Sequence, residues 1–503
     1  MAPKMDDDDL SPSMLCLLLA LALSLLYMAK DALRLRRSRL PPGPSQLPVI
    51  GNLHQLGPKP HKSLAKLAQT YGPVMSLQLG RLTAVIISSA SAAKQVMQKQ
   101  DLAFANRSIP DSLMACDHGN LSVAWIPLSP KWRELRAICN KHIFTSRKME
   151  AFEPARRRKV GDLIAEFERR ASRGDPVLIG EAFFKTLLNF LSSIFLSRDL
   201  DEGDSGVARE FMESFVKIME LGGQPNLVDY FSWLKRVDPQ RIKARSTPHI
   251  AKMLAFVDSM VSERLARGED HGGDVLDTLI QSMQESNGEF TRADIGHLFV
   301  DLFIGGTDTT SSTLEWAISE MMKSPGAVSK AKDELARVVG KGRQVEDGDI
   351  PNLPYLQAVV KETLRLHPPV PFLLPRKNIK DEELWGYTVP KDSQVMVNAW
   401  AIGRDPSSWD SPNSFKPERF LDSEVDVKGG QFELIPFGAG RRICVGMPLA
   451  LKMMHLMLGS VLNCFDLVLE GDAKPEELDM EDEFGLSLHR AQPLRAIPVP
   501  VRV

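Results

Sequence analysis

One short segment, residues 437–446, constrains the fold of this chain more than any other. It reads Phe-Gly-Ala-Gly-Arg-Arg-Ile-Cys-Val-Gly and precedes an apolar run of helical pattern with Pro448 in its first turn. Three glycines let the backbone turn tightly and approach a flat ligand. Cys444 then lies where the free N–H groups of a helix start converge, beside Arg442. Both features favour the thiolate over the thiol.

The other cysteines do not offer Cys444 a partner. The chain has five cysteines, an odd number, and they are widely scattered without a Cys-x-x-Cys pair. This spacing favours neither a disulfide framework nor a zinc site. A lone cysteine before a helix is usually a buried structural residue. A lone thiolate in a glycine-rich loop, however, suits axial ligation of haem iron.

Composition places the chain among globular proteins. It has 503 residues, of which 25% are charged and 43% hydrophobic, which is unlike a disordered or multi-span membrane protein. The net charge of -2 makes it a poor candidate for a nucleic-acid binder. No repeat and no flexible linker after residue 60 divides the chain, so we expect one large folded unit.

The amino terminus has the pattern of a membrane anchor. Residues 10–29 are almost wholly apolar and would form about 30 Å of helix, the thickness of a bilayer core. Acidic residues precede this segment and five basic residues follow it within ten positions. A cleaved secretory signal would begin with a basic region. We therefore predict a lumenal segment 1–9, a transmembrane helix 10–29, a basic and proline-rich linker 30–60 and a cytosolic catalytic domain 61–503.

The rest of the chain predicts a mainly α fold with small β-sheets. Alternating apolar residues on either side of Gly80-Arg81 indicate a β-hairpin. A long helix is expected over residues 291–323. Further helices are expected at 61–71, 90–99, 131–143, 150–172, 181–196, 206–221, 248–267, 273–286, 327–340, 355–366 and 446–463, and short strands at 384–388, 393–397 and 494–502.

Residues 305–310, Gly-Gly-Thr-Asp-Thr-Thr, break a local rule inside the long predicted helix. Two adjacent glycines each cost up to about 1 kcal/mol relative to alanine in a helix interior. Such a departure in mid-element indicates function or strain. Without side chains at Gly305 and Gly306 a ligand can lie against the helix, while the hydroxyl of Thr309 can bond a carbonyl one turn back. A flexible kink with a surface Asp308 is the alternative.

Three further patterns are weak when taken alone. Glu362 and Arg365 share a helix face at a spacing of three residues, which is usually a solvated pair. A Pro-Glu-Arg-Phe segment that contains Arg419 follows about fifty residues later. Trp132 and Arg136 project together from a helix after Pro130.

Together these patterns resemble the cytochrome P-450 enzymes. Phe437 to Gly446 matches their haem-binding signature Phe-x-x-Gly-x-Arg-x-Cys-x-Gly, and the other motifs occur in family order over residues 41–503. The resemblance implies a single P-450 fold that binds haem b, with Cys444 as the axial ligand of the iron.

The resemblance also implies roles for individual residues. Asp308 and Thr309 would be the acid–alcohol pair that relays protons to the oxygen site. Glu362, Arg365 and Arg419 would form a buried charged triad of structural importance. The residues implied to contact haem, by their loop position or through its propionates, are Phe437, Gly446, Arg442, Trp132, Arg136 and Arg376.

The activity implied is that of a monooxygenase. Family members that need no oxygen frequently lack the alcohol found here at Thr309. One oxygen atom from O2 would enter a C–H bond, with two electrons from a separate NADPH–cytochrome reductase at the endoplasmic reticulum membrane. That partner is acidic in the family, so a basic docking face is expected, for which the candidates are Lys131, Arg133, Lys141 and Arg441.

Residues 301–317, 484–488 and 491–496 further resemble the plant microsomal subfamily of geraniol and diterpene hydroxylases. This finer resemblance implies a terpenoid substrate from secondary metabolism. Flavonoids, alkaloids and a non-catalytic membrane-anchored haem protein are the alternatives. Asp301 would either bond a substrate hydroxyl or belong to an internal network. The residues expected in the substrate pocket are Asp301, Leu302, Gly305, Val370, Phe372, Leu373, Phe484 and Leu486.

Overall fold

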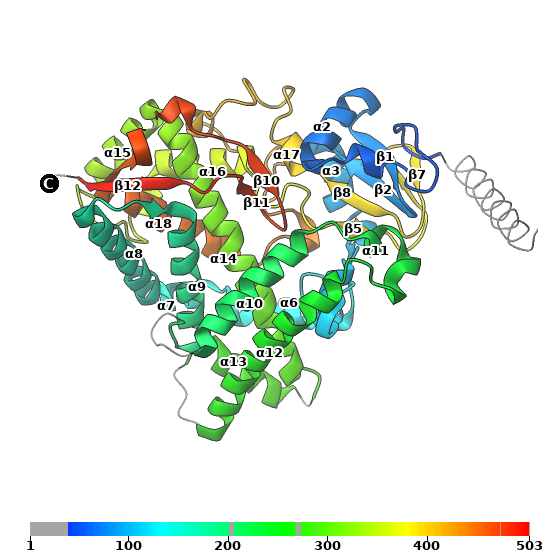
Figure 1. Ribbon diagram of the computed structural model, residues 1–503, viewed down its shortest axis with the longest axis horizontal. Coiled ribbons are helices and arrows are strands. Elements are labelled where there is room, and N and C mark those ends of the chain that lie inside the picture. Colours follow the sequence, from blue (N-terminus) through cyan, green and yellow to red (C-terminus); the bar gives the residue numbers. More distant parts are fainter. Residues whose placement is uncertain (1–38, 201–205, 268–272, 287, 473, 502–503) are drawn as a thin grey trace, which may run out of the picture.

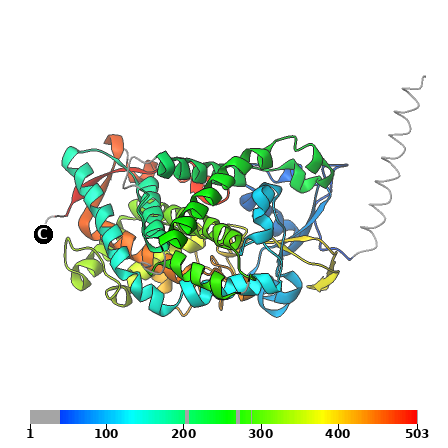
Figure 2. The same ribbon diagram turned by 90° about the horizontal axis from the view of Figure 1, so that it is seen from below.

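A computed structural model describes residues 39–200, 206–267, 273–286, 288–472 and 474–501. The predicted segments 1–9 and 10–29, and the first part of the linker, lie outside the described residues. The described chain is mainly helical with four small sheets, as predicted. The largest sheet lies at one end of the molecule and long helices fill the rest (Figures 1 and 2).

The largest sheet has five strands in the order β1-β2-β8-β5-β3. Its first two strands form the predicted hairpin, with Gly80 at a φ of 58° in the turn. One face buries Met75 and Leu77 against Leu64 of α2 (Pro60–Tyr71). The strands are β1 (Val74–Leu79), β2 (Leu82–Ile87), β3 (Asn106–Arg107), β5 (Arg376–Lys377) and β8 (Gln394–Val397).

The proline-rich stretch before this sheet runs along its first strand. Ser76 donates from its backbone N–H to the carbonyl of Pro42 at 2.9 Å and from its hydroxyl to that of Pro41 at 2.6 Å. A Cβ on Gly43 would lie 1.9 Å from the Ser76 carbonyl oxygen, so only glycine permits this approach. The segment is thus fixed to the body rather than an ordinary loose loop.

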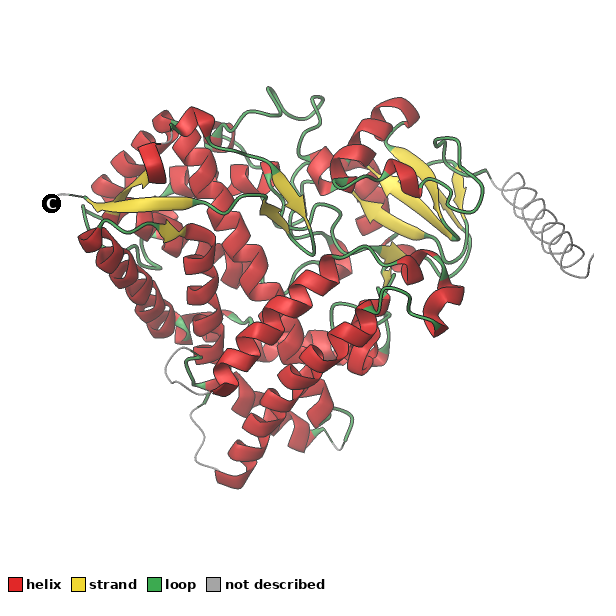
Figure 3. Cartoon of the chain, in the orientation of Figure 1, coloured by secondary structure: helices red, strands yellow, loops and turns green. Residues whose placement is uncertain are grey.

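The remaining strands form three smaller sheets (Figure 3). The strand β12 pairs with β4 on one side and β9 on the other, and two hairpins stand apart. The strands are β4 (Val177–Leu178), β6 (Glu382–Leu384), β7 (Tyr387–Val389), β9 (Phe465–Leu469), β10 (Asp482–Phe484), β11 (Leu488–Arg490) and β12 (Arg495–Pro500).

The helix α14 (Arg292–Lys323) is the central element of the molecule. A capping box fixes its start, because the Thr291 hydroxyl accepts from the Asp294 N–H while the Asp294 carboxylate accepts from the Thr291 N–H. Most of its residues are buried. The helices α9 (Ile179–Leu196) and α18 (Met447–Cys464) pack against it.

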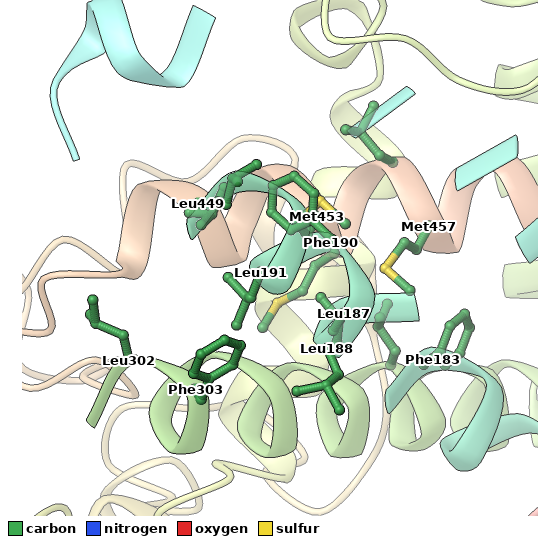
Figure 4. Close-up of a cluster of buried hydrophobic side chains, with 14 of the residues drawn as sticks. Phe183, Leu187, Leu188, Phe190, Leu191, Leu302, Phe303, Leu449, Met453 and Met457 are labelled. Atoms are coloured by element: carbon green, nitrogen blue, oxygen red, sulfur yellow. The ribbon is translucent and has the colours of Figure 1, made fainter. Parts of the chain in front are cut away.

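Figure 4 shows how this core is filled. Phe190 and Leu191 of α9 lie between Phe303 of α14 and Leu449 and Met453 of α18. Both α9 and α18 are long and apolar enough to cross a membrane, but 56% and 72% of these segments are buried inside the protein. They are therefore core helices.

The other helices surround this core, and α10 packs along α12 over one side of it. They are α3 (Ala90–Lys94), α4 (Asp101–Phe104), α5 (His118–Leu121), α6 (Pro130–Ile138), α7 (Ser146–Ala151), α8 (Glu153–Arg173), α10 (Gly206–Gly223), α11 (Leu227–Tyr230), α12 (Ile242–Arg267), α13 (Val275–Glu285), α15 (Pro325–Val338), α16 (Pro354–Leu366) and α17 (Ala399–Ile402), with short 3-10 or π turns between some of them.

Two predicted elements are wrong in detail. The helix expected over 150–172 is divided into α7 and α8, because Pro154 lacks an N–H and stands in the first turn of α8. The strand expected over 384–388 is a hairpin instead. Trp385 and Gly386 take φ values of 58° and 79°, which is the geometry of a two-residue turn between β6 and β7.

Candidate active site

A cavity of about 340 Å³ lies between α14 and the cysteine loop, residues 437–446. Its lining is mostly apolar and comes from α6, α9, α10, α14, α18 and the loops after α5 and α16. Segments from positions 97 to 487 of the chain meet here. The site is therefore assembled by the whole fold.

The cysteine loop carries its sulfur to the cavity wall. Gly438 and Gly440 have φ values of 71° and 68°, and a Cβ on Gly440 would lie 2.1 Å from the carbonyl oxygen of Met97. The N–H of Cys444 donates to the Phe437 carbonyl at 3.0 Å. Cys444 lines the cavity and is exposed there, one turn before α18.

The protonation of Cys444 differs from the sequence expectation. Burial raises the pKa of its thiol, and this effect outweighs the backbone N–H groups of Gly446 and Met447 and the charge of Arg136, all of which lower it. The helix start therefore acts in the predicted direction but does not by itself make a thiolate. Arg136 is the cation that acts on the sulfur, rather than Arg442.

Four arginines, two of them buried and two partly buried, gather beside the cavity. Arg107, Arg136, Arg376 and Arg442 all line it, and Asp101 is the carboxylate that faces them, 3.2 Å from Arg376. Burial first, and then the charges of neighbouring arginines, hold the pKa of Arg107 well below its ordinary value and lower that of Arg442 to about 10. An anionic ligand would relieve this repulsion.

Trp132 supports the same cluster. The guanidinium of Arg442 lies 4.6 Å from the centre of its ring and donates to the carbonyl oxygens of Ala105 and Ile126. These donors fix the side chain in place. A flat, apolar group with two carboxylates and a metal that takes one thiolate fits the residues present, which is the description of haem.

The two glycines of α14 have different surroundings. A Cβ on Gly305 would meet nothing within 4 Å, and Gly305 is exposed to the cavity. A Cβ on Gly306 would lie 2.8 Å from Leu191 of α9. The hydroxyl of Thr309 donates to the Gly305 carbonyl at 2.8 Å, as expected, while α14 continues through this point without a break.

Asp308 points away from the cavity that Thr309 lines. Its Oδ2 lies 3.2 Å from Nε2 of His489 on β11, in an ion pair whose geometry is not that of a well-aligned hydrogen bond. The side chain of Asp308 is 9% exposed and that of His489 is 40% exposed. The acid is therefore buried, and its partner reaches solvent.

Asp301 lines the cavity within an internal network. Ser122 donates to both of its carboxylate oxygens at 2.7 and 2.8 Å, and Nε2 of His118 lies 3.3 Å from Oδ1. Nδ1 of His118 is 3.0 Å from Nδ1 of His297. Burial first, and then the charge of His118, lower the pKa of His297 to about 4, so this ring is neutral. The network joins α5 to α14.

The charged triad is assembled as the resemblance implied. Arg365 donates to Glu362 from Nε and Nη2, each at 2.7 Å, and Arg419 donates to Glu362 from Nε at 3.0 Å. The Lys416 N–H adds a fourth bond at 2.7 Å. Glu362 is fully buried, so these partners satisfy its charge.

Most of the residues expected in the pocket do line the cavity. Phe372 and Phe484 are the exceptions, because their rings lie 5.9 Å apart and pack under the large sheet beside His61. Sequence reasoning missed Phe190 and Phe195 of α9, whose only signal is a long apolar run, and it missed Arg107, which has none. The expected residues that line the cavity are Asp301, Leu302, Gly305, Val370, Leu373 and Leu486.

The fold is mainly helical, and its cavity is lined by a thiol, by a cluster of arginines and by the Thr309 hydroxyl of the central helix α14. Together these features define the class of haem-thiolate proteins. The family model of cytochrome P450 matches residues 41–494. The chain belongs to this family and is a cytochrome P450 monooxygenase with a haem cofactor.

Several curated plant proteins are similar to the chain over nearly its whole length. Geraniol 8-hydroxylase of Catharanthus roseus is 52% identical over 96% of this chain and 98% of its own. Geraniol 8-hydroxylase of Swertia mussotii is 51% identical over 95% and 97%. Drimenol monooxygenase of Persicaria hydropiper is 47% identical over 95% of each chain.

Bound haem supplies the redox chemistry that splits O2, with electrons from a reductase. The chain supplies the rest. Its cysteine loop presents one sulfur, the arginine cluster can hold two carboxylates, and α9 and α10 exclude water from the apolar cavity. Thr309 places a hydroxyl at the cavity wall beside Gly305.

Proposed function

We propose that the protein hydroxylates a terpenoid alcohol, with the substrate hydroxyl bound by Asp301. The observation that carries this proposal is the carboxylate of Asp301, the only one among the described residues that line this mostly apolar cavity. Its four acceptor positions are only partly used by Ser122 and His118, so a substrate O–H has a site. The relatives named for geraniol support the same class of substrate.

The spacing along α14 also favours a particular site of oxidation. Asp301 and Thr309 are eight residues apart, which is about 12 Å along the helix. A hydrogen bond to the carboxylate takes up about 3 Å, which leaves roughly 9 Å. An extended chain advances about 1.2 Å per bond, so this length corresponds to roughly seven or eight bonds. We infer oxidation at the end of the substrate remote from its hydroxyl.

The site residues take the following roles in this proposal. Cys444 binds the haem iron, and Asp308 and Thr309 deliver protons. Leu302, Gly305, Val370, Leu373 and Leu486 shape the apolar part of the pocket. The cofactor is otherwise held by Arg442, Trp132, Arg136, Arg376, Phe437 and Gly446.

We further propose that the body lies against the endoplasmic reticulum membrane on its cytosolic side, held by the predicted anchor at residues 10–29. Val49, Trp233 and Val237 are 71%, 64% and 70% exposed. The segments that carry them meet at the β1–β2 turn, where the Gly80 N–H donates to Ile50 and the Arg81 N–H to Tyr230. Such an apolar surface is costly in water and suits a membrane interface. Electrons would come from NADPH–cytochrome reductase in the same membrane.

A reconstituted assay tests the substrate. The full-length protein, the reductase and NADPH are supplied with geraniol, its acetate ester, the parent hydrocarbon, a flavonoid and an alkaloid. We expect product from the alcohol, oxidised at the far end, and much less from the ester and hydrocarbon. Product from the flavonoid or alkaloid alone would overturn the terpenoid assignment. Product from none, with an intact red-shifted carbon monoxide absorption, would favour a non-catalytic haem protein.

The variant Asp301→Asn tests whether Asp301 binds the substrate hydroxyl. It keeps the shape of the side chain but replaces one acceptor oxygen by a donor. We expect the dissociation constant of the alcohol to rise on the order of tenfold, while that of the hydrocarbon stays unchanged. The control Leu302→Val trims the apolar wall and should weaken both ligands alike. Equal effects of Asp301→Asn on the two ligands would show that the carboxylate serves only the internal network.

A further inference from the structure

The partner of Asp308 is a titratable residue that touches both solvent and the active-site helix. His489 lies on β11, and β11 is pinned to α14 because the Leu488 carbonyl accepts from the Ser312 hydroxyl at 2.8 Å and from the Trp316 ring N–H at 3.1 Å. Asp308 and Ser312 are one turn apart on the same face of α14. The imidazole is therefore held over the carboxylate by the fold rather than by the ion pair alone.

Acidic groups surround this imidazole. Asp308 and Glu315 face it from α14, and Glu483 is its direct cross-strand neighbour on β10. The neighbouring Arg490 donates to the carbonyls of Asp479 and Gln492 instead. Partial burial lowers the pKa of His489, but Asp308, Glu315 and Glu483 together outweigh it, so the pKa lies above the ordinary value. The ring is thus charged below that raised pKa and loses its charge as the pH rises through it.

We propose that His489 supplies Asp308 with protons from solvent and so serves as the outer end of the proton path to the cavity. In this step the Nε2–H bond of the imidazolium breaks and an O–H bond forms on the Asp308 carboxylate. The neutral imidazole keeps its Nδ1–H and takes the replacement proton from water at Nε2, once the protonated Asp308 carboxyl has moved away from it. His489 acts through Asp308 and touches neither substrate nor cofactor.

A histidine suits this place better than a permanent cation. The carboxyl of Asp308 does not line the cavity while it is paired, so it must leave its partner to pass a proton toward Thr309. Transfer of the proton leaves both groups neutral and removes the attraction that held them. A lysine or arginine would keep its charge at neutral pH and hold the carboxylate in place.

The test uses the full-length holoenzyme with reductase and any compound that it oxidises, so it does not depend on the terpenoid assignment. Product formed per NADPH consumed and the solvent isotope effect are measured between about pH 6 and 8. For the wild type we expect the yield to fall as the pH rises. His489→Gln should give a severalfold lower yield, a larger isotope effect and a flat pH profile, with unchanged unfolding temperature and carbon monoxide absorption.

Two further variants distinguish proton supply from an ion pair that only holds Asp308 in place. His489→Lys keeps a cation against Asp308, so an ion pair with a purely structural role would be preserved. We expect instead the same low yield and flat pH profile as for His489→Gln. His54→Gln, at an exposed histidine outside the site, is the matched control and should behave like the wild type. A wild-type yield and pH profile in His489→Lys would overturn the proposal.

A measurement without turnover completes the test. The histidine resonances of the isotope-labelled protein are titrated by NMR, and the signal lost in His489→Gln is assigned to His489. We expect its midpoint to fall in Asp308→Asn, because the attraction of the carboxylate is removed. An unchanged midpoint would mean that the two groups do not exchange a proton, and would overturn the proposal whether or not the variants fold well.

Discussion

Thr309 and Asp308 are sequence neighbours that face different sides of one helix. Successive residues of an α-helix point about 100° apart, so one of the two lines the cavity while the other meets β11. The alcohol holds its hydroxyl against the Gly305 carbonyl, and the acid is held by His489. In the proposed proton path, Thr309 is therefore the fixed group at the cavity and Asp308 the group that must move.

Removal of the Thr309 hydroxyl tests the part that this residue plays in the proposed proton path. Thr309→Ala should lower product formed per NADPH on the order of 10²-fold, because proton delivery at the groove loses its hydroxyl. Binding of substrate, followed by its spectral shift, should change little. Thr307→Ala is the matched control, since Thr307 makes the same bond to a carbonyl one turn back, at 2.7 Å, without lining the cavity. Equal losses in the two variants would indicate helix damage instead.

At the scale of single residues, the sequence predicted which residues lie at the site better than it predicted their protonation. Cys444, Thr309 and Asp301 were found because each stands in a local pattern of glycines, a cap or a helical spacing. The protonation of Cys444 was not predictable, since it depends on how much burial opposes the local N–H groups. His489 gave no signal at all, because its partner is 181 positions away and only the packing of β11 on α14 joins them.

At the scale of the element, α14 combines a cavity wall and a packing face in two adjacent glycines. Gly305 leaves the groove open, and Gly306 lets α9 approach, where Leu191 fills the space. The double glycine was expected to leave space for a ligand, and both glycines line the cavity, but a Cβ on Gly306 would also meet α9. Whether Gly305 or Gly306 contacts α9 depends on tertiary packing, and helical periodicity alone does not determine it.

Alanine at each glycine should separate the two roles. Gly305→Ala has space for its Cβ and should stabilise the fold by about 0.5–1 kcal/mol while it weakens binding of bulky substrates. Gly306→Ala should destabilise the fold by about 1–3 kcal/mol through its contact with Leu191. Unfolding midpoints and substrate titrations of both variants give the comparison. An exchange of these effects would mean that the helix faces are assigned incorrectly.

The Glu362 triad joins α16 to the segment around Arg419, and its motif is uninformative in isolation. Arg419→Met should destabilise the fold by about 3–5 kcal/mol, because it leaves the buried carboxylate short of a partner. Denaturant unfolding of the holoenzyme measures this loss. The exposed ion pair of Arg169 with Glu166 offers a control, in which Arg169→Met should cost less than about 1 kcal/mol. Similar costs for the two would show that the triad is not a closed network.

For the whole molecule, the helices and the main hairpin were predictable and the cavity was not. Long periodic segments such as α14 and α8 carry their own signal along the chain, and they form largely where expected. The cavity instead depends on the way α9, α10 and the loop after α5 converge over α14. Phe484 illustrates this, because it is only two residues from Leu486, which lines the cavity, yet its ring packs under the sheet beside His61.

The same distinction between local signal and tertiary packing applies to the docking face that was expected for the reductase. Lys131 was a candidate, but its ammonium group lies 2.7 Å from Asp294 in the capping box of α14, so it is part of the fold. Arg133 and Lys141 are exposed on α6 and the turn that follows it. This segment adjoins the cysteine loop, because a Cβ on Gly446 would lie 3.9 Å from the Phe144 ring. Both cations therefore lie on an element beside the sulfur.

Neutralisation of these two cations should slow electron delivery and nothing else. For Arg133→Ala combined with Lys141→Ala we expect reduction by the reductase to slow about tenfold at low salt, with a smaller difference at high salt as screening removes the attraction. Stopped-flow reduction measures the rate, and chemical reduction and the carbon monoxide absorption should be unchanged. The pair Arg169→Ala and Arg173→Ala on α8 removes two exposed cations elsewhere. If that pair slows reduction equally, overall charge rather than this face attracts the partner.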